Sequence, residues 1–183
     1  MKKQISIVAA LVFVATQAAF ADAMGDQHLS YDQGRADLFR DNELSLDAFG
    51  TDALGRYTID HPSGDRISHN SRLGLGLGAN YFLIRYVGVG VEAFSENTDA
   101  HFVDNASASL IVRFPIEVIG LAPYGFAGGG HQWDPIDANF THVGVGVEYR
   151  FNPHIGVFAD GRGVWTDRAR NYGLFRAGVR FAL

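Results

Sequence analysis

The 183-residue sequence contains no cysteine, and its only lysines are Lys2 and Lys3. The lack of cysteine excludes structural disulfides and a lipoprotein anchor. Apart from the first 21 residues, no apolar run approaches the roughly 20 residues that a membrane-spanning helix needs. Loss of both lysines with those first residues would change the formal net charge from −5 to −7. An acidic chain of this kind argues against nucleic acid as a partner.

The N-terminus has the features of a secretory signal peptide. Lys2 and Lys3 precede an apolar run over residues 5–15, and small residues with an Ala-x-Ala step follow. We expect cleavage after Ala21, with Ala23 as the alternative site. The apolar run is too short for a transmembrane anchor. The sequence therefore predicts Sec-type export of a mature chain that has the length of a single domain.

The rest of the chain is dominated by alternation of apolar and polar residues, the period of a β-strand with two different faces. We expect eight strands, each close to the roughly 9–11 residues of a tilted membrane-spanning strand. The expected strands are residues 42–50, 72–81, 87–95, 106–115, 122–132, 141–151, 155–165 and 172–183. Three connections are short (82–86, 116–121 and 152–154), whereas the others are polar and mostly longer (51–71, 96–105, 133–140 and 166–171). Short turns at one end and longer loops at the other are typical of outer-membrane barrels.

Sorting the strands by parity predicts one bulky apolar face and one face of glycine and charge. The residues expected on the apolar face include Leu75, Val91, Leu110, Tyr124, Phe126, Val143, Val145, Val147, Val157, Val179 and Phe181. The residues expected on the other face include Gly74, Gly76, Gly88, His131, Gly144, Gly146 and the charged residues named below. A soluble barrel has the same period and is the alternative. However, glycine is a poor exposed strand residue, and a narrow barrel needs it to hold large side chains inside. We therefore expect the apolar face to contact lipid.

Aromatic residues are expected to gather at both ends of the barrel. The short-turn end would have Tyr81, Tyr86, Phe114, Tyr124, Tyr149 and Phe151. The long-loop end would have Phe94, Trp133, Phe140, Trp165 and Tyr172. The two interfaces of a membrane select two such girdles, which supports the membrane interpretation.

The predicted lumen holds five acids and six arginines. The acids are Glu43, Asp47, Glu92, Glu148 and Asp160, and the bases are Arg72, Arg113, Arg150, Arg162, Arg176 and Arg180. Their near balance predicts mutual pairing, because unpaired buried ions are costly. An eight-stranded barrel is only wide enough for side chains to fill. We expect a lumen plugged by salt bridges, with a narrow water or ion leak as the alternative to this plug.

The end of the chain resembles the C-terminal assembly signal of bacterial outer-membrane proteins. Arg176 is the polar residue, Gly178 follows two positions later, and Phe181 and Leu183 are hydrophobic. The terminal Leu183 differs from the commoner phenylalanine. Residues 144–151, with the tight turn and alternating strand after them, are similar to the late strands of small OmpA/OmpX-type barrels. The resemblance implies an eight-stranded barrel in a Gram-negative outer membrane, inserted by the assembly machinery. Unlike full-length OmpA-type proteins, the chain is expected to have no peptidoglycan-binding domain after the eighth strand.

Metal binding at the long loops is a weaker interpretation. The histidines expected at this end are His61, His69, His101, His131 and His142, with several aspartates nearby. None of these histidines has the tight spacing of a metal motif. We therefore expect solvated loop residues and predict no metal or cofactor.

Enzymatic interpretations find little support in the sequence. His69 and Ser71 have the His-x-Ser spacing of lipid A deacylase barrels. In that family the motif lies within a strand toward the C-terminus, whereas here it ends the first long loop. A palmitoyltransferase barrel would need an amphipathic N-terminal helix and a lumen emptied for an acyl chain. The glycine-rich residues 74–78 do not indicate a nucleotide site, because no helix that could hold a phosphate follows them.

The sequence thus predicts an all-β protein with an eight-stranded antiparallel up-and-down transmembrane β-barrel. Residues 1–21 are the expected signal peptide, 22–41 an N-terminal periplasmic segment and 42–183 the outer-membrane barrel. We expect a monomer in contact with outer-membrane lipid and lipopolysaccharide. Its expected role is non-enzymatic, either membrane integrity or binding of an extracellular ligand by surface loops, as in adhesion. A deacylase-like lipid A enzyme and a narrow pore are the alternatives.

Overall fold

The structure is a computed structural model that describes residues 38–54, 57–60, 66–69, 72–95, 103–133, 137–167 and 171–183. Side chains are described throughout these ranges except at 57–60, 66–69 and 72. The predicted signal peptide therefore lies outside the described residues, as does the predicted periplasmic segment up to residue 37. No helix in the described ranges is long and apolar enough to cross a membrane.

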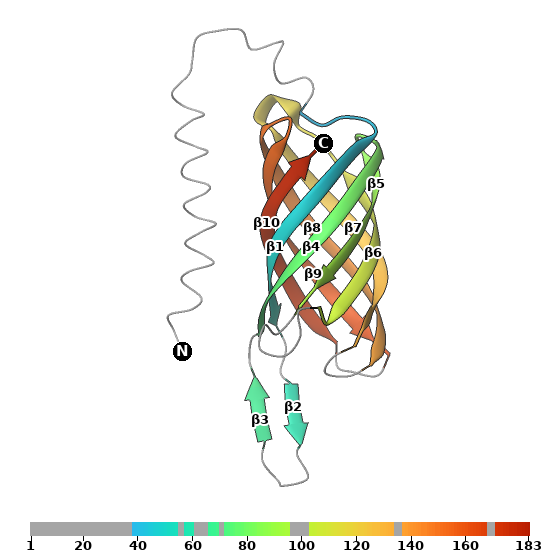
Figure 1. Cartoon of the computed structure of the whole chain (residues 1–183), viewed down its shortest axis with the longest axis vertical. Helices are drawn as coiled ribbons and strands as arrows, with labels where there is room; N and C mark the ends of the chain where they lie inside the picture. Colours follow the sequence, from blue (N-terminus) through green and yellow to red (C-terminus); the bar gives the residue numbers. More distant parts are fainter. Residues whose placement is uncertain are drawn as a thin grey trace. The chain divides into compact units, whose positions relative to one another are not determined.

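Eight strands form a closed antiparallel barrel, as the sequence predicts (Figure 1). They are β1 (Glu43–Leu54), β4 (Arg72–Ile84), β5 (Val87–Phe94), β6 (Asn105–Arg113), β7 (Leu121–Gln132), β8 (Ala138–Asn152), β9 (Ile155–Thr166) and β10 (Tyr172–Ala182). The order around the barrel is β1-β10-β9-β8-β7-β6-β5-β4, which is an up-and-down topology closed by pairing of the first and last strands.

Two of the predicted connections contain secondary structure. The segment 51–71 was expected to be a loop, but β1 extends to Leu54, and β2 (Tyr57–Asp60) pairs with β3 (Arg66–His69) as a hairpin. The short connection between β6 and β7 contains the 3₁₀ turn η1 (Glu117–Ile119). The longer β1, the separate hairpin and the 3₁₀ turn leave the strand order of the barrel wall unchanged.

The strand register makes the barrel narrow. From Ala48, the Cα partners across β4, β5, β6 and β7 lead to Asn139 on β8. In the other direction, across β10 and β9, they lead to Tyr149 on the same strand. This ten-residue offset tilts the strands, and eight tilted strands enclose an interior that side chains can fill.

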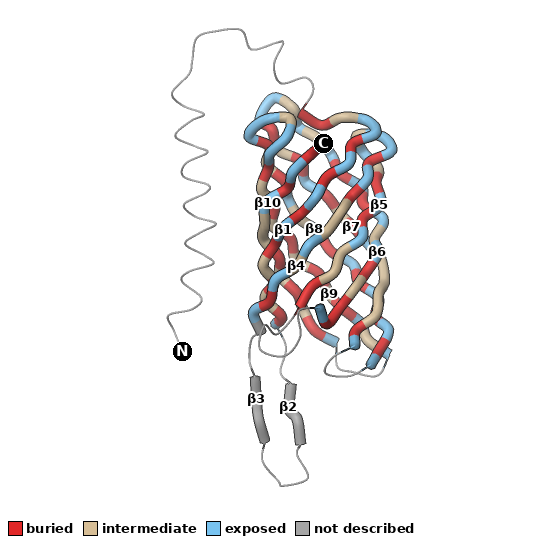
Figure 2. The backbone as a smooth tube through the Cα atoms, viewed as in Figure 1, coloured by how far each residue is buried: buried red, intermediate tan, exposed pale blue. Residues whose placement is uncertain are grey.

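Buried and exposed residues alternate along the strands (Figure 2). The outward face is apolar: Val145 is 71% exposed, Leu75 63% and Phe114 62%. Glycines make room on the inward face. A Cβ at Gly144 would overlap the Phe126 ring and lie 2.8 Å from Cβ of Arg162. The exposed apolar wall and crowded interior are the arrangement of a barrel that contacts lipid.

The predicted parity of β7 is wrong. Tyr124 and Phe126, expected to face lipid, are each only 6% exposed and point into the lumen. His131, expected in the lumen, is on the opposite face and half-buried. Between Leu121 and Gln132 the strand has glycines on both faces and no Asp, Glu, Lys or Arg, so nothing in its pattern marks the inward side.

Only part of the predicted long-loop girdle is on the outer surface. Trp133 and Trp165 are exposed, but Phe94, Phe140 and Tyr172 are buried inside the barrel. These three rings belong to the loop-end apolar cluster, whose members are Phe49, Ala53, Phe94, Phe140, Phe158, Val164, Tyr172 and Leu174. Aromatic residues here fill the lumen as well as contacting the membrane interface.

Candidate functional site: the charged lumen

The structure brings the charged residues predicted for the lumen into two groups. The turn-end group consists of Glu43, Asp47, Arg113, Glu148, Arg150 and Arg180, and the central group consists of Glu92, Asp160, Arg162 and Arg176. Nine of these ten residues are buried, and the side chain of Glu92 is only 10% exposed. Each group has equal numbers of acids and arginines. Arg72 pairs through its backbone with Ala53, but its side chain lies outside the described part of the chain.

Glu43 and Glu148 hold the turn-end group together. Arg113 Nη1 donates to Glu43 Oε1 at 3.0 Å, and Arg150 Nη2 donates to the same oxygen at 2.7 Å. Arg150 also donates to Glu148, whose other oxygen accepts a 2.6 Å hydrogen bond from Arg180 Nη1. Each carboxylate therefore contacts two guanidinium groups, as a buried charge requires.

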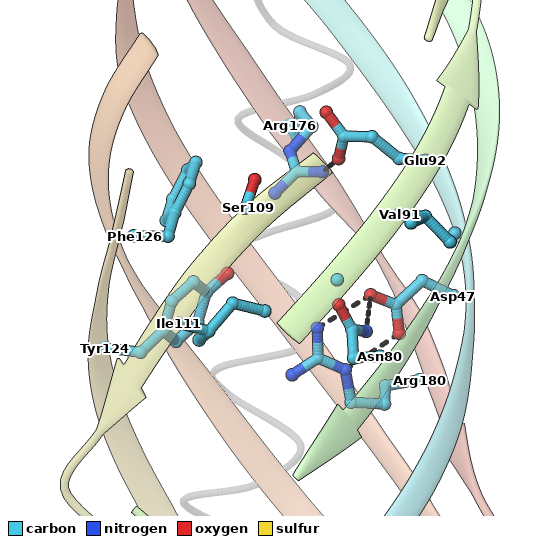
Figure 3. Close-up of a pocket in the computed structure, with 12 residues that line it drawn as sticks. Asp47, Asn80, Val91, Glu92, Ser109, Ile111, Tyr124, Phe126, Arg176 and Arg180 are labelled. Atoms are coloured by element: carbon cyan, nitrogen blue, oxygen red, sulfur yellow. Dashed lines mark hydrogen bonds and ion pairs between the residues drawn. The ribbon is translucent and has the colours of Figure 1, made fainter. Parts of the chain in front are cut away.

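Asp47 and Arg180 form a bidentate pair within this group. Nε and Nη2 of Arg180 donate to the two carboxylate oxygens of Asp47, both at 2.7 Å (Figure 3). Asn80 Nδ2 donates to the same carboxylate at 2.9 Å. Parallel hydrogen bonds of this geometry are stronger and more directional than a single contact, and they require arginine rather than lysine.

The central group is organised around Arg176. Its Nε and Nη2 donate to the two oxygens of Asp160 at 2.8 and 2.6 Å, and its Nη1 donates to Glu92. Glu92 also pairs with Arg162. The hydroxyl of Tyr124 donates to Asp160 at 2.7 Å, which gives the inward side chain of β7 a polar partner.

Aromatic rings cover the arginines where carboxylates do not. The Cζ of Arg113 lies 3.6 Å from the centre of the Phe82 ring, and the Cζ of Arg176 lies 5.0 Å from that of Phe49. Arg180 is similarly placed over Phe158 at 5.1 Å. Such contacts stabilise a desolvated cation. The described lumen side chains thus include both ion pairs and aromatic rings packed against them.

A small cavity lies between the two groups. Its volume is about 20 Å³, and its lining includes Asp47, Glu92, Ser109, Arg176 and Arg180 (Figure 3). A space of this size holds about one water molecule. The cavity is therefore too small for an acyl chain or a hydrated ion.

His142 is a lumen residue, although it was grouped with the loop histidines at the long-loop end. It is fully buried, contacts the rings of Phe126 and Phe140, and is hydrogen-bonded through Nε2 to Ser109 Oγ at 2.9 Å. Its parity with Gly144, two positions later in the same strand, was the signal that could have placed it inside.

The side chains of the loop histidines that were weighed as metal ligands lie mostly outside the described part of the structure. His61 and His101 lie there, and the side chain of His69 is not described. His131 is hydrogen-bonded to Asn139 at 3.0 Å and lies 3.5 Å from Asp137. Within the described ranges, no group of three or more His, Cys, Asp or Glu side chains could hold a metal ion.

The four residues of the predicted assembly signal take different positions. Arg176 points into the lumen, whereas Phe181 and Leu183 are exposed on the outer face. Gly178 lies where a side chain would collide with the backbone of β1, 2.8 Å from Cα of Phe49. The exposed apolar residues remain accessible on the last strand.

Comparisons with known proteins identify the fold. Neither a protein-family model nor a curated protein sequence matches the chain. Among solved structures, the N-terminal β-barrel domain of Pseudomonas aeruginosa OprF is similar, with a TM-score of 0.58 and 20% identity over 79% of this chain and 99% of that one. OprG from Pseudomonas aeruginosa has a TM-score of 0.53 and 11% identity over 79% and 97% of the two chains. Neisserial surface protein A has a TM-score of 0.52 and 20% identity over 76% and 95%. The chain therefore has the fold of the small eight-stranded outer-membrane β-barrels.

Proposed function

We propose that the protein is a monomeric, non-enzymatic barrel of a Gram-negative outer membrane, with its lumen plugged by the two ion-pair groups. The fold and the exposed apolar wall support this location. The role that fits a filled lumen is structural, contributing to membrane integrity or presenting the long loops to an extracellular ligand. Its remaining contacts would be outer-membrane lipid, lipopolysaccharide and the assembly machinery, which would recognise Phe181 and Leu183 on the last strand.

The observation that carries this proposal is the pairing of the lumen charges in two groups with only a small cavity between them. Both groups are balanced in charge, and the cavity between them has room for about one water molecule. A pore would need a continuous path of water along the lumen charges. The layer in which Arg176 pairs with Asp160 and Glu92 stands across such a path.

Conductance in a planar lipid bilayer tests the plug. The refolded protein should give no stable nanosiemens steps at moderate voltage, because ions cannot pass the paired side chains without breaking them. A general porin inserted under the same conditions is the positive control. Stable openings of nanosiemens size from folded protein would overturn the plug.

One pair of side chains bears on the deacylase alternative. Ser109 and His142 form a hydrogen-bonded Ser–His pair, but Ser109 lines a cavity of about 20 Å³ that cannot admit an acyl chain. Ser71 lies outside the described residues. Incubation with lipopolysaccharide, followed by mass spectrometry of lipid A, should show no loss of an acyl chain. Release of fatty acid by the wild type but not by Ser71→Ala or Ser109→Ala would establish the enzyme instead.

A loop-trimmed variant separates the two structural roles. Replacing residues 55–71 by a short turn removes the β2–β3 hairpin and leaves the barrel strands β1 and β4 nearly complete. If the role is membrane integrity, this variant should restore detergent resistance to a deletion strain as well as the full chain does. If the role is loop display, it should lose cell-surface binding while the barrel remains folded.

A further inference from the structure

The segment Leu38–Arg40, which precedes strand β1, lies at the short-turn end of the lumen. Leu38 and Phe39 are 4% and 1% exposed, and they form an apolar cluster with Ala122 of β7. Their sequence surroundings are polar, so burial here is not the continuation of an amphipathic element. Contacts with the barrel must therefore stabilise the buried ring of Phe39 at this end.

These contacts are made by the outermost pair of arginines in the turn-end group. The ring of Phe39 packs near both of them, with its centre 5.0 Å from Cζ of Arg113 and 5.1 Å from Cζ of Arg150. Arg150 Nη1 also donates to the carbonyl oxygen of Leu38 at 3.1 Å. The aromatic ring of Phe39 thus stabilises the two guanidinium groups. The carbonyl oxygen of Leu38 accepts a hydrogen bond from an N–H of Arg150 in addition to those that the carboxylates accept.

Arg40 fastens the segment on the other side. Its backbone N–H donates to Glu43 Oε2 at 3.2 Å, and its Nη2 donates to the carbonyl oxygen of Leu183 at 3.3 Å. The chain then reverses at Asn42, whose φ of 55° is in the left-handed region that asparagine tolerates best after glycine. The hydroxyl of Tyr81 donates to the side chain of Asn42 at 3.1 Å and supports this reversal.

We propose that Leu38–Arg40 is a strap that closes the short-turn mouth of the lumen and keeps water from the turn-end group. The ion pairs beneath it are strong only while they are shielded, because water would compete for each hydrogen bond. In the contacts that the structure describes, the strap is held by side chains, by the carbonyl of Leu38 and by the backbone N–H of Arg40, not by strand pairing. It can therefore be weakened without altering the register of the barrel wall.

The absence of cysteine makes the strap directly testable. Ala122 is fully buried beneath Leu38 and Phe39, so an Ala122→Cys variant places a single thiol under the strap. A charged thiol reagent, applied to the folded protein in detergent, should label this cysteine slowly. Adding Phe39→Gly should raise the labelling rate by about tenfold or more, because the mouth then opens to solvent.

A second cysteine gives the matched control. Ala53 is 3% exposed and lies in the loop-end apolar cluster, so Ala53→Cys should be labelled slowly whether or not Phe39 is present. Equal labelling of the Ala122→Cys thiol with and without Phe39, or rapid labelling with the strap intact, would overturn the proposal. Heat-dependent gel mobility checks that each variant is folded. If Phe39→Gly does not fold, Arg40→Ala should still accelerate labelling at position 122 while sparing position 53.

Discussion

Replacing Glu148 with glutamine should strongly destabilise the barrel. Glu148 is fully buried, accepts a 2.6 Å hydrogen bond from Arg180, pairs with Arg150 and lies 3.8 Å from Arg113. Glutamine keeps the shape of the side chain but removes its charge, so three arginines would then face two carboxylates. Breaking a buried pair in this way costs about 3–5 kcal/mol, since the remaining charge stays desolvated.

Urea unfolding in detergent micelles or lipid vesicles measures this loss. The fluorescence of Trp133 and Trp165, the only tryptophans, would report the transition. Glu117→Gln is the matched control, because Glu117 pairs with Arg85 at 2.7 Å at the surface, where the two side chains are 25% and 41% exposed. That exposed pair should contribute no more than about 1 kcal/mol.

A double variant tests the charge-balance reasoning itself. Combining Glu148→Gln with Arg113→Met returns the turn-end group to two acids and two arginines. The double variant should be more stable than the sum of the two single effects predicts, because the two positions are coupled. If Glu148→Gln unfolds within about 1 kcal/mol of the wild type, the network does not hold the barrel as described.

Three further predictions concern the wall and its interior. Gly144→Ala should lower the free energy of unfolding by about 1–3 kcal/mol, because the new Cβ would overlap the Phe126 ring. Gly161→Ala should change the free energy of unfolding by less than about 0.5 kcal/mol, because a Cβ at this position meets no atom within 4 Å. Equal effects in urea titrations would contradict the inward and outward assignments. Tyr124→Phe should cost about 1.5 kcal/mol through loss of its 2.7 Å hydrogen bond to a buried carboxylate, measured by the same titration; no change would mean that this bond adds nothing. Val145→Arg should destabilise the protein in lipid vesicles by about 2–4 kcal/mol, and a neutral result would argue that this face does not contact the hydrocarbon.

The sequence predicts the wall of the barrel far better than the contents of its lumen. In most strands bulky apolar residues alternate with glycine or charge, as from Val143 to Arg150, and parity then identifies the lipid face. Strand β7 lacks that contrast, so the inward position of Tyr124 depends on its partner Asp160, which belongs to a different strand. A pattern within one strand cannot contain that information.

The pairing of the lumen charges also could not be predicted from the residue pattern of single strands. Composition and parity indicate which charged residues face inward and that their numbers nearly balance. Which carboxylate meets which arginine depends on the ten-residue offset of the closed barrel, since it sets the height of each strand against those across the lumen. The burial of Phe39 was missed for a related reason: its polar neighbours conceal it, and only the assembled mouth offers it two guanidiniums.

The distribution of the ion pairs along the chain has a consequence for the order of folding. Arg176 and Arg180 belong to the last strand, yet they supply partners to Asp47, Glu92 and Glu148 on three earlier strands. Until that strand docks, Asp47 lacks its arginine and Glu92 and Glu148 each lack one of theirs, so a half-formed barrel in hydrocarbon would carry unmatched charge. Closure and charge neutralisation must therefore occur together. Such a barrel should enter the membrane nearly complete, with few stable intermediates between the open and the closed sheet.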